Sequence, residues 1–216
     1  MSSAFLYFRK DQPMKYMIKH VTTEHELDDA LALDRKVFGM PSERCSSAYS
    51  REKWLERTPS FGDLMLYAES GGETVGIVFG RVEGNGSITV GPVAVDERFH
   101  KQGIAREMML LLETRALGHG IRHLGLGAME SAEGFYEKLG YTGSLLLQSE
   151  RYSIDELLAL NTKYPVIHTN VYEGTVNQVF LELPAADREF QRNCECTLPG
   201  CYTQMVYGKT IETEGF

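Results

Sequence analysis

Hydrophobic residues recur at two spacings along the chain, and the alternation between them predicts helices interleaved with short strands. A strand is expected at 17–21, then a helix that a Thr23–Glu26 capping box opens and Gly39 closes. Further helices are expected at 50–57, 103–117 and 131–139, the last capped by Ser131, and further strands at 64–68, 74–82, 87–95, 121–126 and 141–147. Because this order mixes hairpins with crossover helices, it predicts a mixed α/β sheet.

Two turn signals refine this pattern. Gly84-Asn85-Gly86 is typical of a β-hairpin, because positive φ angles cost little at these residues. Gly91-Pro92 interrupts the strand that follows, and proline has no N–H to donate to a neighbouring strand. A bulge or an unpaired edge is therefore predicted in the middle of that strand.

The pattern changes after about Ser149. Ser153 and Glu156 form a second capping box, 166–172 and 175–183 alternate as strands, and an amphipathic piece, a cysteine-bearing loop and a strand at 203–207 follow. The predicted organisation is a loosely ordered leader at 1–15, a main domain at 16–149 and a small α/β extension at 150–216. At this size the extension is expected to pack on the main domain or on a second subunit.

Composition excludes several classes of protein. The chain has 216 residues, 43% of them hydrophobic and 24% charged, with a formal net charge of −8. This balance argues against nucleic acid as a partner and mildly favours a cationic small molecule. The longest aliphatic run, Met108 to Leu112, is too short to span a membrane, and neither a signal peptide nor a disulfide framework is evident. A cytoplasmic protein with no membrane partner is therefore expected.

The segment 93–106 carries the most informative motif, a strand followed by a tight turn and a helix start. Helix starts expose unpaired N–H groups, and Gly103 and Ala105 leave room for a ligand to approach them. Lys101 and Arg106 add positive charge, so the segment predicts a pyrophosphate site. An ordinary strand-to-helix turn is the alternative. Neither the P-loop nor the dinucleotide-binding glycine pattern is present.

Two elements carry a resemblance to a known family. The run from His100 through Gly103 to Ala105 resembles the Arg/Gln-x-x-Gly-x-Gly/Ala signature of the GNAT superfamily of acetyl-CoA-dependent N-acetyltransferases, with histidine in the first position. The segment 132–141 is similar to that superfamily's Ala-x-x-x-Tyr-Glu-Lys-x-Gly-Phe element. The resemblance covers about 17–147. It implies a mixed, mostly antiparallel sheet with splayed central strands between helices, and acetyl-CoA as cosubstrate.

The resemblance also implies which residues bind the cofactor. Main-chain groups of the strand at 93–95 are expected to bind pantetheine, and the turn at 100–106 the pyrophosphate. Met129 replaces the family's asparagine, and Ser131 is a substitute for it. The expected cofactor-binding residues are Val93, Ala94, Val95, His100, Lys101, Gln102, Gly103, Ile104, Ala105, Arg106 and Ser131.

The implied activity is acetyl transfer to a primary amine by direct attack in a ternary complex. Tyr136 occupies the position of the superfamily's general acid and is expected to protonate the leaving thiolate; a purely structural role in the core is the alternative. Glu83 and Asp96 are the candidates for general base, although each also fits a solvated surface carboxylate. The acceptor, a small-molecule or peptide amine, is not identified.

Other interpretations remain open. Cys194, Cys196 and Cys201, with His168 as a fourth ligand, fit a zinc site poorly, so no metal is expected and buried or free thiols are favoured. A non-catalytic acyl-CoA sensor or regulatory module acting through the extension is the main functional alternative. The extension is also a candidate dimerisation arm, which makes a homodimer a further alternative.

Overall fold

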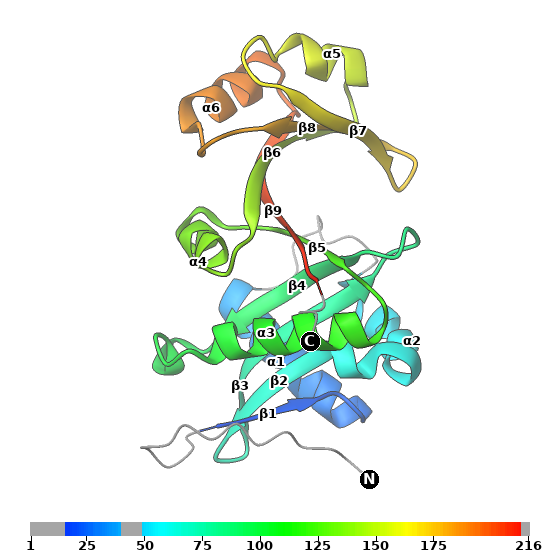
Figure 1. Cartoon of the computed structure of the whole chain (residues 1–216), viewed down its shortest axis with the longest axis vertical. Coiled ribbons are helices and arrows are strands. Elements are labelled where there is room, and N and C mark those ends of the chain that lie inside the picture. Colours follow the sequence, from blue (N-terminus) through cyan, green and yellow to red (C-terminus); the bar gives the residue numbers. More distant parts are fainter. Residues whose placement is uncertain (1–15, 40–48, 213–216) are drawn as a thin grey trace. The chain divides into compact units, whose positions relative to one another are not determined.

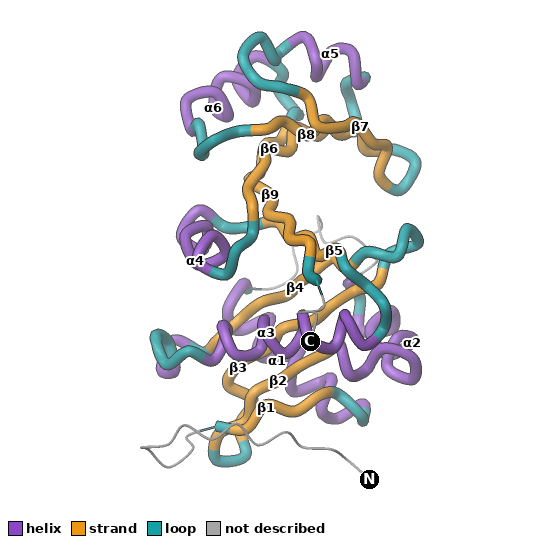
Figure 2. Tube along the Cα trace, viewed as in Figure 1, coloured by secondary structure: helices purple, strands orange, loops and turns teal. Residues whose placement is uncertain are grey.

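The computed structural model describes residues 16–39 and 49–212, so the predicted leader at 1–15 lies outside the described residues. Nine strands and six α-helices are present in these ranges (Figures 1 and 2). They fall into two compact units, one running to Leu124 and rejoined by Ile211 and Glu212, the other Gly125–Thr210. The predicted mixed, mostly antiparallel α/β fold is confirmed.

The first unit is built on four antiparallel strands in sequence order: β1 (Met17–His20), β2 (Met65–Ser70), β3 (Glu73–Val82) and β4 (Ile88–Val95). The predicted hairpin joins β3 to β4, with Glu83 N–H donating to Ser87 O at 2.8 Å. The predicted bulge is also confirmed: the β3–β4 register shifts between Val78 and Gly80, opposite Gly91-Pro92.

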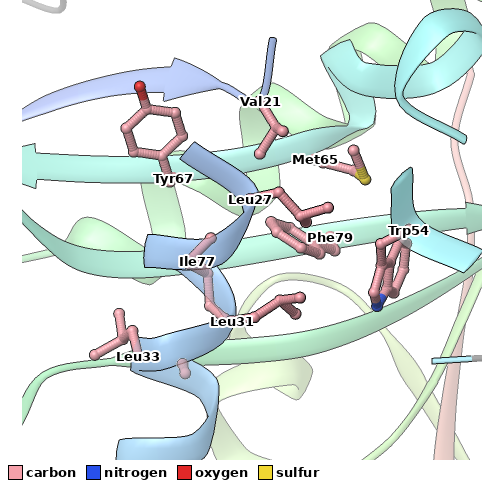
Figure 3. Close-up of a cluster of buried hydrophobic side chains, with 11 residues drawn as sticks. Val21, Leu27, Leu31, Leu33, Trp54, Met65, Tyr67, Ile77 and Phe79 are labelled. Atoms are coloured by element: carbon pink, nitrogen blue, oxygen red, sulfur yellow. The ribbon is translucent and has the colours of Figure 1, made fainter. Parts of the chain in front are cut away.

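Helices cover both faces of this sheet. On one face, α1 (Glu24–Phe38) and α2 (Arg51–Phe61) bury Leu27, Leu31 and Trp54 against Ile77 and Phe79 (Figure 3). Trp54 is fully buried and meets Phe79 edge-on at 5.1 Å. The Thr23–Glu26 capping box predicted for α1 is present.

On the opposite face lies α3 (Ile104–Gly118). It packs so closely on β3 that a Cβ added to Gly76 would lie 2.9 Å from the Ile104 side chain, and one added to Gly80 would lie 3.0 Å from that of Leu112. Real Cβ contacts are rarely this short, so both positions require glycine unless the helix moves. This packing fixes α3 against the strand that leads to β4.

The second unit contains β6 (Thr142–Ser149) between β9 (Tyr202–Thr210) and β8 (Val176–Glu182), with β7 (Val166–Tyr172) at the edge. Helices α5 (Ile154–Ala159) and α6 (Arg188–Thr197) contact β8 and β9, and Leu157 and Cys194 are buried there. The remaining elements are β5 (His123–Gly127), at the unit boundary, and α4 (Glu133–Lys138).

Long-range pairing changes how the extension is understood. Residues 150–201 lie in sequence between β6 and β9, yet these two strands pair directly, from Thr142 opposite Gly208 to Gln148 opposite Tyr202. The division between the compact units accordingly falls after Leu124, whereas the predicted boundary lay at Ser149. The predicted cysteine-bearing loop was wrong for Cys194 and Cys196, which lie on α6.

Candidate functional site

The turn that joins β4 to α3 has an unusual backbone. Asp96 begins a 3₁₀ turn at Glu97–Phe99, and Lys101 and Gly103 then adopt positive φ angles of 60° and 89°. Positive φ is strained for lysine and easy for glycine. Gly103 is the residue that precedes α3 and offers no side-chain cap.

This turn presents a row of donors. The first intrahelical bond of α3 runs from Glu107 N–H to Gly103 O at 3.0 Å, and the N–H groups of residues 101–106 make no hydrogen bond to any described residue. They lie at the positive end of the helix dipole, and Lys101 and Arg106 are exposed beside them. Unpaired amides with adjacent cations fit the pyrophosphate of a nucleotide cofactor.

The backbone N–H and C=O groups at the end of β4 point alternately toward β3 and away from it. The Asp96 N–H donates to Val75 O at 2.9 Å, toward β3. Because N–H directions alternate along an antiparallel strand, Val95 and Val93, opposite Gly76 and Val78, direct their backbone groups to the other edge. The backbone groups of the buried Ala94 point toward β3. The backbone groups of Val93 and Val95 are therefore the ones that fit a ligand lying along β4.

His100 is tied to the same strand. Its Nε2 lies 2.9 Å from Val95 O, a distance at which a protonated Nε2 donates to that carbonyl. The ring therefore closes the turn back onto β4 and fixes the Val95 carbonyl on the edge of β4 that is directed away from β3. His100, which stands where the family signature has arginine or glutamine, is thus held in place by its contact with Val95.

The structure argues against both interpretations of Asp96, the general base and the solvated surface carboxylate. Its side chain is only 2% exposed and accepts hydrogen bonds from Lys36 Nζ at 2.6 Å and from Arg98 Nε at 2.9 Å. These hydrogen bonds, that of Arg98 foremost, hold the pKa of Asp96 well below its usual range. The group remains ionised and locked in place, so it caps the turn and does not accept a proton.

Glu83 lies at the other end of the β3–β4 pair. Its carboxylate, 26% exposed, forms an ion pair with Arg81 at 2.7 Å and accepts a hydrogen bond from the Thr89 hydroxyl. Both partners orient the carboxylate on the α1–α2 face of the sheet, because Arg81 and Thr89 are register partners on β3 and β4. Glu83 is therefore held but still reaches solvent, as a proton acceptor must.

Arg81 and Arg57 were missed in the sequence. Arg81 is 8% exposed and lies over the Tyr49 ring, while Arg57 of α2 lies over Trp54. An arginine that interrupts the apolar run of β3 was the available signal, because a charge is rarely buried without a partner or a function.

Tyr136 and Ser131 belong to the second unit. Tyr136 is 6% exposed on α4, between the rings of Phe135, Tyr141 and Tyr207, and burial raises its pKa to about 12. No described residue hydrogen-bonds to its hydroxyl. The phenol therefore keeps its proton at neutral pH and has it available to donate.

The helix cap predicted at Ser131 is wrong. A 3₁₀ turn at Glu130–Ala132 precedes α4, and the residue at the cap position is Ala132, which has no side chain to accept a hydrogen bond. Ser131 is exposed on that turn. Its expected contact with the cofactor stays a prediction.

The cysteines do not assemble a metal site in the described ranges. Cys194 and Cys201 are buried, and burial raises the pKa of each thiol to about 11, whereas Cys196 is exposed. His168 stacks instead on Phe180, with ring centroids 4.1 Å apart. Among the residues described, no three His, Cys, Asp or Glu side chains converge as metal ligands.

A known protein family matches the part of the chain that contains this turn. The model of the Acetyltransferase (GNAT) family aligns with residues 27–141, just over half of the chain, from α1 through the turn at 100–106 to the end of α4. The chain belongs to the GNAT acetyltransferase family. This GNAT protein therefore shares the family's cosubstrate, acetyl-CoA.

Solved structures share its fold. The ribosomal-protein-S18-alanine N-acetyltransferase from Escherichia coli is 14% identical with a TM-score of 0.52, covering 93% of this chain and 98% of its own. A GNAT acetyltransferase from Staphylococcus aureus Mu50 is 13% identical with a TM-score of 0.53, covering 91% and 99%. Ard1 from Thermoplasma volcanium is 14% identical with a TM-score of 0.50, covering 79% and 99%.

Two further comparisons are negative. No curated protein matches this GNAT chain. Within residues 16–39 and 49–212, none of the helices combines the length and the apolar character that crossing a bilayer requires.

Proposed function

We propose that this GNAT protein transfers the acetyl group of acetyl-CoA to a primary amine by direct attack in a ternary complex. The observation that carries the proposal is the row of unpaired N–H groups at 101–106, which follows a strand whose Val93 and Val95 backbone groups point away from β3. A pyrophosphate and an extended pantetheine arm need these two features in this order.

Each part of the cosubstrate has a counterpart in the chain. The amides of residues 101–106, with Lys101 and Arg106, bind the pyrophosphate, and the backbone of Val93 and Val95 binds the amides of pantetheine. His100 holds the Val95 carbonyl in position for that contact. Bound acetyl-CoA supplies an activated acetyl thioester.

The amine must lose a proton before it can attack. An alkylamine has a pKa of about 10.4, so producing its neutral form at pH 7 costs roughly 4.6 kcal/mol. Glu83 takes this proton in our proposal, directly or through water. Its support is the orientation given by Arg81 and Thr89 together with its partial exposure. Asp96 is left out because its carboxylate is fully engaged.

Tyr136 supplies the second proton. As the bond from the amine nitrogen to the acetyl carbon forms and the carbon–sulfur bond breaks, the sulfur gains a proton from the Tyr136 hydroxyl. The nitrogen gives up its second proton, which returns to the Tyr136 oxygen directly or through water, and Glu83 releases the first proton to solvent. The products are an N-acetylated amine and a free thiol. The pKa of about 12 keeps the hydroxyl protonated until it is needed.

The proposal is tested with the full-length protein. Calorimetry with CoA measures binding, and release of free thiol from acetyl-CoA in the presence of polyamines, amino acids, aminoglycosides and N-terminal peptides measures transfer. We expect binding and amine-dependent thiol release. Binding without release from any amine would favour a sensor, and no binding would refute the assignment of the turn.

A further inference from the structure

Helix α4, which carries Tyr136, has little support of its own. It spans six residues, and Ala132 at its cap position makes no side-chain hydrogen bond. A helix of fewer than two turns is not stable in isolation, so contacts with other elements decide where its side chains point. Its two buried residues are Glu133 and Tyr136, which lie three positions apart and therefore on one face. A contact that holds Glu133 thus also sets the rotation of Tyr136.

Glu133 is held by the segment 150–201, which lies between β6 and β9 in sequence. Arg188, the first residue of α6, donates from Nη2 to Glu133 Oε1, and its Nε lies 3.6 Å from Glu130 Oε1. The same guanidinium donates from Nη1 to Oε1 of the buried Gln191 at 2.7 Å. Arg188 therefore bridges α4 and α6, and the plane of its guanidinium is fixed by acceptors on both helices.

The ion pair between Arg188 and Glu133 is largely removed from water. Glu133 is 8% exposed, and its hydrogen bond raises the pKa of Arg188. A carboxylate that stays buried after losing its cation is strongly destabilising, so without Arg188 the Glu133 side chain would turn toward water. Because Glu133 and Tyr136 share one face of α4, that movement would rotate or displace Tyr136.

The other end of α4 is held by β9. The Tyr207 hydroxyl donates to Glu137 at 3.3 Å, and Lys209 Nζ donates to the Leu139 carbonyl at 2.8 Å, just beyond the helix. The Tyr207 ring centre lies 6.1 Å from that of Tyr136. These contacts fix the end of α4 while the ion pair of Arg188 fixes its beginning. Once the beginning is released, the helix can pivot about its end.

We infer that Arg188 is a positioning residue for Tyr136: by holding Glu133 it fixes the rotation of α4 and thereby the direction of the phenol hydroxyl. This inference rests on the proposed function and gives the segment 150–201 a part in it. A proton donor that is misplaced by about 1 Å loses much of its effect on the rate. A purely structural ion pair is the alternative, and it would change stability alone.

The test is a double-mutant cycle in the full-length protein, with kcat measured by thiol release at saturating acetyl-CoA and amine. Arg188→Gln should lower kcat by about 10- to 100-fold, because a small displacement of a catalytic group costs this much, and should leave the Kd for CoA unchanged. In the Tyr136→Phe background the same substitution should have little further effect, since the proton donor is already absent. Equal losses of kcat in both backgrounds would overturn the inference.

Conservative and control variants separate positioning from folding, and thermal melting accompanies each assay. Arg188→Lys keeps the charge but cannot contact Glu133 and Gln191 together, so it should recover part of kcat. Glu133→Gln removes the other half of the ion pair and gives a second cycle with Tyr136→Phe if Arg188→Gln does not fold. Arg192→Gln, exposed on the same helix α6, should leave kcat unchanged.

A measurement without turnover distinguishes this inference from the proposed function. Tyrosines are replaced by 3-fluorotyrosine, and the Tyr136 fluorine signal is assigned by its absence in Tyr136→Phe. We expect Arg188→Gln to shift or broaden that signal and Arg192→Gln to leave it unchanged. A changed signal with no thiol release from any amine retains the hold of Arg188 on Tyr136 and refutes acetyl transfer. Thiol release that Arg188→Gln leaves intact retains the transfer and refutes the inference. An unchanged signal with no thiol release refutes both.

Discussion

His100 Nε2 lies 2.9 Å from the carbonyl oxygen of Val95, so a ring at the start of the turn at 100–106 holds the last residue of β4. The contact links the two parts of the proposed cofactor site within the first unit. Val95 directs its backbone away from β3, and this contact gives its carbonyl a donor on that side. Position 100 thus acts on the strand as well as on the turn.

His100→Ala is expected to weaken CoA binding. Loss of one hydrogen bond of this kind costs about 0.5–1.5 kcal/mol, which corresponds to a roughly two- to tenfold higher Kd. His100→Gln, whose amide can also donate, should recover part of the loss. Calorimetry measures both, with His25→Ala on the exposed face of α1 as the control. An unchanged Kd for His100→Ala would show that the contact does not orient the site.

Gly103→Ala tests the backbone of the turn. An alanine at φ 89° is strained by about 1–2 kcal/mol, and this strain falls on the residue that connects the turn to α3. We expect a lower melting temperature and a Kd for CoA at least about tenfold higher. Gly118→Ala, at the other end of α3 and with no heavy atom within 4 Å of the added carbon, should be neutral or slightly stabilising. Similar effects at both positions would contradict this account.

The sequence correctly predicted several features that depend on residues close together in the chain. The capping boxes at Thr23–Glu26 and Ser153–Glu156 are both present, since each needs only residues three apart. The bulge at Gly91-Pro92 likewise follows from the missing proline N–H. Ser131 shows the limit of this reasoning: it has the right residue type for a cap, but a 3₁₀ turn moves the helix start past it.

What was missed depends on contacts between distant residues. Asp96 is held by Lys36, sixty positions earlier, and no local pattern encodes that contact. The strand predicted at 203–207 is present as β9, but its pairing with β6 across the intervening residues 150–201 is again a contact that no local pattern encodes. Helix α6 was predicted only in part, as the amphipathic piece after Pro184, and its later residues were assigned to a cysteine-bearing loop. The residues that it buries are Gln191 and Cys194, and a polar Gln191 is not typical of a core position.

Asp96 and Glu83 should respond differently to loss of charge. Asp96→Asn removes two ion pairs with Lys36 and Arg98, so we expect unfolding to become easier by about 1–3 kcal/mol with an unchanged pH profile of kcat. Glu83→Gln removes the proposed base, so kcat should fall by about 10²–10⁴. Denaturant titration and pH–rate profiles check both. An altered profile in Asp96→Asn would restore it as a candidate base.

Glu26 makes stability depend on acid pH. Partial burial raises its pKa, but hydrogen bonds from Thr22, Tyr67 and Thr23 outweigh this and bring the pKa to about 2. Its folded-state pKa lies below the unfolded value, so its contribution is present above about pH 4.3 and is lost as pH falls toward 2. Glu26→Gln should be less stable than the wild type by about 1 kcal/mol at pH 7 and equally stable near pH 2. A pH-independent difference in denaturant titrations would exclude this mechanism.

Tyr136→Phe separates proton donation from packing. Phenylalanine keeps the ring among Phe135, Tyr141 and Tyr207, and no described residue loses a hydrogen bond, so melting temperature and CoA affinity should hold. Without the donor, kcat should fall by about 10²–10⁴. Tyr207→Phe is the matched control and should retain most of kcat. The Tyr207 hydroxyl that it removes donates a hydrogen bond to Glu137 at 3.3 Å. A thioester with a more acidic leaving thiol needs less protonation, so the difference in kcat between the wild type and Tyr136→Phe should be smaller with that thioester. If the difference in kcat is the same for both thioesters, Tyr136 does not protonate the sulfur.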